Sequence, residues 1–311
     1  MKKKQVYIIL IILAAGVAGW FGYKYFFGKK SANSSGKNVT VQSFSPNSCW
    51  IYHEYVYRVD FSDTSLTPFL FVRETNGSFS PSIADSSGNH INGNGFIIDS
   101  EGACVITDQI ATPWELTYEE QQPLKELVDT WLDMKEGLST KEYQITGQTV
   151  ALFVVLNDPK DFIEYAASTQ MTGQQGYSLI YPYEKIQLKG INAAFSLSAD
   201  NSVLGETVFQ VVKTTFDEND TENPTAITSI DSITATRTGD GYLDNIKVMK
   251  GDEFFNEGSV VFDVSGNCLG NLHYENDKWK LITFLSFVPN PPTYEDNEWK
   301  QNWEYDLSRR S

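Results

Sequence analysis

The chain has 311 residues, of which 41% are hydrophobic and 14% aromatic, enough to build a sizeable core and to argue against disorder outside the ends. It carries 24 basic and 40 acidic residues, and six of the lysines but no acid fall in residues 1–30, so the remaining body has a net charge of −22. A body this acidic repels phosphate backbones, which argues against a nucleic-acid-binding role.

The N-terminal segment predicts a membrane anchor. Residues 5–23 lack charge between Lys4 and Lys24, and a helix of that length just reaches across a bilayer core of about 30 Å. A cleaved signal peptide is the alternative, but the apolar stretch continues past the small residues at 16–18. We therefore expect residues 1–30 to be an uncleaved transmembrane helix.

Charge around this segment predicts its orientation. Three lysines and the α-amine precede the apolar stretch, and three lysines follow it. The slight N-terminal excess predicts a cytoplasmic N-terminus and an extracytoplasmic body. Residues 31–47 begin rich in Ser, Gly and Asn and are expected to be a flexible tether.

Short apolar runs bounded by turn residues predict a mainly β body over residues 48–290. The expected strands are 50–60, 69–73, 95–98, 104–107, 149–156, 207–213, 227–236, 259–263, 267–272 and 279–287. Residues 291–311 form a polar tail with two Trp, for which both disorder and docking on the body stay open.

One segment has helical spacing instead. Thr117 and Glu120 form a capping box, an apolar stripe follows, and Gly137 is a natural stop. Pro123 marks either a kink or the true first turn. We expect a helical insert over about 117–137, packed on the body by its apolar face.

Two hairpin-like stretches resemble each other. FIIDSEGACVI, at 96–106, and VVFDVSGNCLGNL, at 260–272, both run from an apolar segment through Asp and a Ser/Gly turn to a Cys. Their separation is about half of the body, which predicts two similar β units of the paired-barrel kind.

Three stretches in this order resemble trypsin-like serine proteases of the HtrA type. They are GNGFIIDSEGACVITDQIA at 93–111, FSLSADNSVLGETVFQVV at 195–212 and NEGSVVFDVSGNCLG at 256–270. The resemblance implies two six-stranded β-barrels with the active site in the crevice between them. It also implies a serine endopeptidase activity, for which the residues at the catalytic positions matter.

At the positions of the family's catalytic residues, this chain has other residue types. Gln109 aligns with the histidine base, and an amide cannot accept a proton near neutral pH. Glu257 aligns with the nucleophilic serine, where a carboxylate opposes formation of an oxyanion. The orienting aspartate falls on or near Pro182, in YPYEKIQLKG, with Asp158 and Asp161 as alternatives, and Phe255 replaces the glycine of the oxyanion loop.

A displaced triad is the alternative. It would need one of the three histidines, His53, His90 or His273, to reach a serine such as Ser259. Each histidine is isolated in sequence, and a structural or surface role is the commoner one for such a residue.

Cofactor and metal motifs are not recognisable. The cysteines at 49, 104 and 268 include no CxxC and have no nearby histidine, which argues against zinc. The acidic loops at 217–223 and 239–245 lack calcium-loop spacing, with Gly251 where the bidentate Glu would stand, and no phosphate or dinucleotide loop appears. We expect no cofactor and no metal.

These observations favour a membrane-anchored, trypsin-fold pseudoprotease acting as a binding or scaffold module. Its ligand would be a peptide or protein in the crevice between the barrels. The alternatives are an active serine endopeptidase with a displaced triad, and a structural envelope protein that docks a partner on the aromatic strand 50–61.

Overall fold

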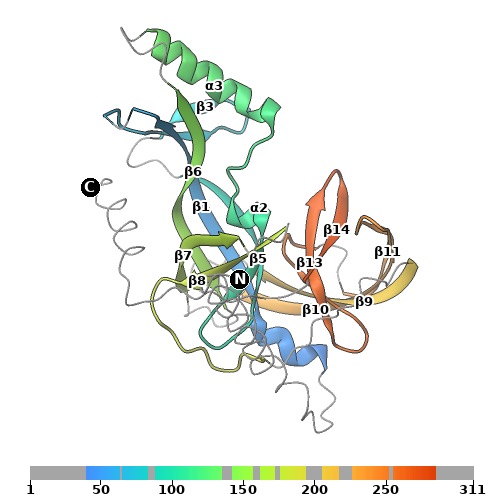
Figure 1. Ribbon diagram of the computed structural model, residues 1–311. Coiled ribbons are helices and arrows are strands. Elements are labelled where there is room, and N and C mark those ends of the chain that lie inside the picture. Colours follow the sequence, from blue (N-terminus) through green and yellow to red (C-terminus); the bar gives the residue numbers. More distant parts are fainter. Residues whose placement is uncertain are drawn as a thin grey trace, which may run out of the picture. The chain divides into compact units, whose positions relative to one another are not determined.

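Figure 1 shows a computed structural model, which describes residues 40–284 except 64, 83–87, 135–141, 157–161, 172–175, 194–204, 217–225 and 252–254. Its helices are η1 Val41–Asn47, α2 Asp108–Ala111 and α3 Tyr118–Asp133. Its strands are β1 Ser48–Phe61, β2 Phe69–Arg73, β3 Phe79–Pro81, β4 Asn89–Ile97, β5 Cys104–Thr107, β6 Tyr143–Val155, β7 Phe162–Met171, β8 Tyr177–Pro182, β9 Gly205–Phe216, β10 Ala226–Arg237, β11 Leu243–Lys250, β12 Val260–Phe262, β13 Cys268–Glu275 and β14 Lys278–Thr283.

The long strand β1 closes the first sheet into a barrel. The sheet has the order β3-β2-β1-β4-β5-β8-β7-β6, and β1 also pairs with β6 from Trp50–Val155 to Phe61–Tyr143. Six strands therefore form a closed ring, and β2 and β3 extend it where β1 continues beyond β4. The eight strands are antiparallel throughout.

The second sheet has six strands but is a half-barrel. Its order is β11-β10-β9-β12-β13-β14, and among the described residues an isolated bridge links Tyr242, just before β11, to Lys280 of β14. Both sheets share one strand order. If the six strands of the ring and the six strands of the second sheet are each numbered along the chain, neighbours follow the cyclic order 1-2-3-6-5-4. The expectation of a mainly β fold is confirmed, while the second expected barrel is only partly closed.

The two similar hairpins do not occupy equivalent places. The first joins β4 to β5, the second and third strands of its ring, whereas the second joins β12 to β13, the fourth and fifth. Their likeness comes from turn chemistry, since Asp99 accepts from the N–H groups of Glu101 and Ala103, and Asp263 from those of Ser265 and Asn267. The repeat in the sequence is therefore a repeat of turns.

An apolar cluster joins the two sheets. It combines Phe96 and Val105 of the first sheet with Val212 and Phe262 of the second. Separate clusters fill the barrel and line the half-barrel. Burial of this apolar surface stabilises the pairing of the sheets.

The tether predicted over 31–47 is wrong at its C-terminal end. Residues 41–47 form η1, because the Phe44 ring stacks on Phe262 with centroids 5.1 Å apart and is fully buried. Asn47 Nδ2 also donates to Ile97 O at 2.7 Å. Residues 1–39, with the predicted anchor, and the tail 291–311 lie outside the described residues.

The helix expected over about 117–137 is present as α3, and its expected stop at Gly137 lies outside the described residues. Thr117 and Glu120 form the predicted capping box, so the helix begins at Tyr118 and Pro123 lies inside it. Leu124 and Val128 are buried against β1 and β2. In the part of the chain that the structure describes, no helix has the length and hydropathy that crossing a membrane requires.

The three cysteines are free thiols inside the fold. Cys49 Sγ and Cys104 Sγ lie 3.7 Å apart, and both are close to Gly95, where a Cβ would collide with them. They come from β1 and β5, which are separated by β4. The Cα atoms of Cys49 and Cys104 are therefore two strand spacings apart, which is more than a disulfide can bridge. The two thiols are close without being positioned to form a disulfide.

Candidate functional site

The turn Asn256–Ser259, just before β12, matches the nucleophile loop of the resemblance. Ser259 N–H donates to Asn256 O at 3.1 Å, and Gly258 N–H donates to Leu272 O at 2.8 Å. Gly258 has φ +81°, and a Cβ there would lie 2.1 Å from Asn94 O. Only glycine fits this position, for both conformational and spatial reasons.

Asn94 of β4 ties this turn to both sheets. Its N–H donates to Glu257 O at 2.6 Å, and its Nδ2 donates to Thr214 O of β9 at 2.6 Å. Its Oδ1 accepts from Thr214 N at 3.1 Å and from Ser259 Oγ at 3.1 Å. Asn94, Thr214 and Ser259 are fully buried, so the Ser259 hydroxyl is enclosed and donates within this network.

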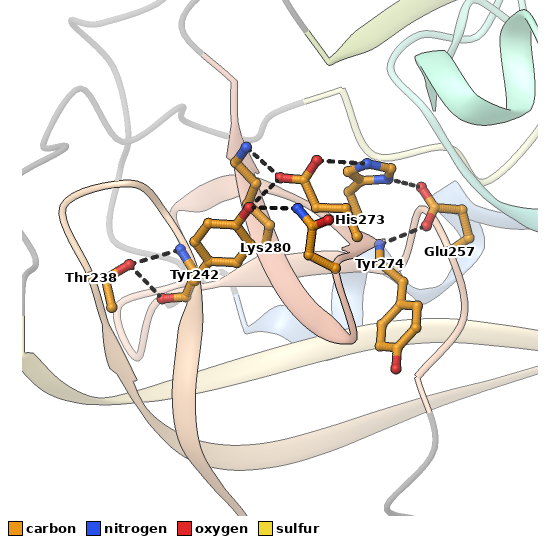
Figure 2. Close-up of polar contacts among 8 residues, drawn as sticks. Thr238, Tyr242, Glu257, His273, Tyr274 and Lys280 are labelled. Carbon is orange, nitrogen blue, oxygen red and sulfur yellow. Dashed lines mark hydrogen bonds and ion pairs between the residues drawn. The ribbon is translucent and has the colours of Figure 1, made fainter. Parts of the chain in front are cut away.

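The Glu257 carboxylate is bound on both oxygens by β13. Its Oε1 lies 3.0 Å from His273 Nδ1, and its Oε2 accepts from Tyr274 N at 2.9 Å. The Glu257 side chain is 12% exposed and that of His273 is 22% exposed. Figure 2 shows the two side chains facing each other.

A chain of polar groups continues beyond His273. Its Nε2 lies 3.7 Å from Glu275 Oε2, and Glu275 Oε1 accepts from Lys280 Nζ at 2.6 Å and from Tyr242 Oη at 2.9 Å. The hydrogen bond to Glu257 raises the pKa of His273, because it favours the imidazolium form, and burial acts against it. The site is therefore a row of alternating negative and positive groups.

This raised pKa predicts how stability depends on pH. The stabilisation from protonated His273 is complete below its ordinary pKa of 6.5 and is lost as pH rises through the higher pKa of the folded state. We expect the stability advantage of wild type over His273→Gln to shrink from about pH 5.5 to about pH 9 in urea denaturation. An advantage that grows with pH would contradict the charge pairing.

Of the other aligned positions, Gln109 is exposed on α2. The next residue, Ile110, and Glu257 O of the turn both approach Gly93, where a Cβ would lie 2.3 Å from Ile110 Cδ1 and 2.8 Å from Glu257 O. Pro182, at the end of β8, packs near Gly102. Among the described residues, no hydrogen bond or ion pair joins Gln109, Pro182 and Glu257 to one another.

The two remaining histidines lie elsewhere. His53 is fully buried, with Nδ1 2.6 Å from Ile110 O and Nε2 2.9 Å from Thr149 Oγ1, and burial lowers its pKa to about 4. It is therefore neutral at neutral pH. His90 is exposed, with its ring stacked on Tyr52. The alternative acids Asp158 and Asp161 lie outside the described residues.

Sequence reasoning missed the partners of the turn. Asn94 lies within the GNG stretch that carried the resemblance, but nothing marked its side chain as the link between sheets. Asp108, beside Gln109, was also missed, although its Oδ1 accepts from Ser178 Oγ at 2.7 Å and its Oδ2 from Gly176 N at 2.8 Å. Within the described ranges, no three His, Cys, Asp or Glu side chains are grouped as a metal would require.

No protein-family model matches this chain. No curated protein matches it either. The barrel architecture supports a trypsin-like fold. Among solved structures, the crystal structure of Deg5 is similar to 77% of this chain and 85% of that chain, with 11% identity and a TM-score of 0.36. A similarity this low carries no argument, so the fold assignment depends on strand order and closure.

Proposed function

We propose that this chain is a catalytically inactive, trypsin-fold protein that acts as a binding or scaffold module. The main support is the state of residue 257, where the resemblance expects a nucleophile. A carboxylate stands there, engaged by His273 and by Tyr274 N–H. Its negative charge opposes the oxyanion that acyl transfer has to stabilise.

Within the described residues, no histidine hydrogen-bonds to a serine hydroxyl at the turn. His273 lies against Glu257 instead, and this hydrogen bond raises the pKa of His273. Ser259 is fully buried and its hydroxyl donates to Asn94. The second candidate function is a serine endopeptidase with a displaced triad that includes His273 and Ser259. Ser259 is part of the turn, and His273 contacts the turn through Glu257.

The ligand proposed for the crevice is a peptide or protein segment. The placement proposed for the body is outside the cytoplasmic membrane, held by an N-terminal helix over residues 1–30. That part of the proposal is supported by the uncharged stretch at 5–23 and the lysines on both sides.

Covalent labelling tests the absence of catalysis. The full chain is incubated with a fluorophosphonate probe at neutral pH beside trypsin, and with a peptide library. We expect no labelled serine and no cleavage, because activated serine is what such probes require. Labelling that disappears in Ser259→Ala would instead establish the displaced-triad enzyme.

A further inference from the structure

A groove of about 520 Å³ lies between α3 and the β2–β3 extension of the first sheet. Figure 1 shows α3 beside β3. Trp131 lines it and lies edge-on to Phe69, with ring centroids 4.4 Å apart. Other lining residues are Phe71, Pro81, Leu127 and Met134. This surface is separate from the turn at Glu257.

The helix presents large apolar side chains to solvent at this groove. Leu127 is 39% exposed and Met134 is 72% exposed, although both lie beside the buried stripe that holds α3 on the sheet. Contiguous exposed apolar surface costs free energy in water and marks an interaction site more often than single exposed residues do. Methionine adapts its shape to varied partners.

Three carboxylates lie on the exposed side of α3, the helix that forms one wall of the groove. Glu119, Glu126 and Asp133 are spaced seven residues apart, which places them on nearly the same side of α3. All three are exposed, and their side chains make no hydrogen bond or ion pair within the described residues. Glu120, by contrast, is paired with Arg73 at 3.1 Å. The groove therefore combines an apolar lining with a negative rim, the row of three carboxylates on the exposed side of α3.

We propose that this groove binds a cationic amphipathic segment of a partner protein. The bulky apolar side chains of this segment enter the groove beside Trp131. The Lys or Arg side chains of the segment face Glu119, Glu126 and Asp133. An amphipathic helix laid into an apolar groove is a common recognition mode. Complementary charge gives it specificity and speeds its association.

Charge disfavours three other possible occupants of the groove, namely a lipid surface, the chain's own tail and a second copy of the chain. Anionic lipid headgroups would meet the same negative rim. The chain's own tail at 291–311 has five acids and three bases, and a second copy brings another body of net charge −22. Each of these would be repelled, whereas a basic segment gains from the rim.

The experiment uses a fluorescent helical peptide of leucine and lysine, about 14 residues long, with leucines on one face and a benzophenone at a leucine position. Its anisotropy is measured with the full chain at low and high salt, beside a peptide with glutamate in place of lysine. We expect the lysine peptide to bind, the glutamate peptide not to bind, and crosslinks to map to Leu127 or Met134. Affinity should fall about tenfold in high salt.

Two variants make the result specific. Leu127→Glu, at an exposed position, and the triple reversal Glu119→Lys, Glu126→Lys, Asp133→Lys should each weaken binding about tenfold. The matched control Glu206→Lys reverses an exposed acid on β9 and should leave affinity within about twofold. Equal binding of both peptides, crosslinks elsewhere, or preferential binding of phosphatidylglycerol vesicles would each overturn the proposal.

Discussion

Replacing Asn94 by Ala is expected to destabilise the fold by about 3–5 kcal/mol, measured by urea denaturation of the full chain. The variant removes three buried side-chain hydrogen bonds, two to Thr214 and one from Ser259. Each partner is fully buried and has no access to water as a substitute. The loss of stability is large because a buried donor or acceptor left without a partner costs more free energy than one hydrogen bond contributes.

The control for Asn94 is Asn76→Ala. Asn76 also accepts two hydrogen bonds, from Ser78 N at 2.9 Å and Ser78 Oγ at 2.7 Å, but it is exposed in the turn between β2 and β3. Water replaces those bonds, so we expect a loss below about 1 kcal/mol. Similar losses in both variants would show that the network around Asn94 does not hold the sheets together.

The buried ion pair between Lys213 of β9 and Asp231 of β10 gives the second large effect. Lys213 Nζ lies 2.7 Å from Asp231 Oδ2, and the side chains are 3% and 2% exposed. Lys213→Met or Asp231→Leu alone should destabilise the fold by about 3–5 kcal/mol, because either leaves a buried charge without its partner. The double variant should lie within about 1 kcal/mol of wild type or above it.

Denaturation of all four proteins measures this coupling as a double-mutant cycle. The exposed pair Lys278–Asp244, whose side chains are 56% and 38% exposed, is the control, and Asp244→Ala should cost less than about 1 kcal/mol. Additive losses in the buried pair would mean that its two charges are stabilised independently.

The sequence predicts strands well where one face is polar and turns are rich in Gly, Asn or Asp. The bounds expected for β2 and β5 match the structure. The strand β8 was missed because all six of its residues are buried, so it shows no alternation. Residues 184–188 belong to YPYEKIQLKG, which the resemblance matches to the strand after the orienting aspartate, but they lie just after β8 and outside any strand.

The candidate site was predicted only in part, for a different physical reason. The turn at 256–259 is local, and its Asn-Glu-Gly pattern identified Glu257. Its contacts with His273 and Asn94 depend on how β13 and β4 are placed by pairing with other strands. Pairing over such sequence separations is set by the whole sheet and leaves no local signal.

The turn at 256–259 has backbone contacts that do not involve the side chain of residue 257, besides the two contacts that the Glu257 carboxylate makes with β13. Its backbone is held through Glu257 O, Gly258 N–H and the hydroxyl of Ser259, with left-handed Gly258 between them. The groups that hold the backbone of the turn are therefore different from the carboxylate at residue 257. We therefore expect a replacement of Glu257 to leave the backbone contacts of the turn in place, while His273 and the Tyr274 N–H lose their carboxylate partner.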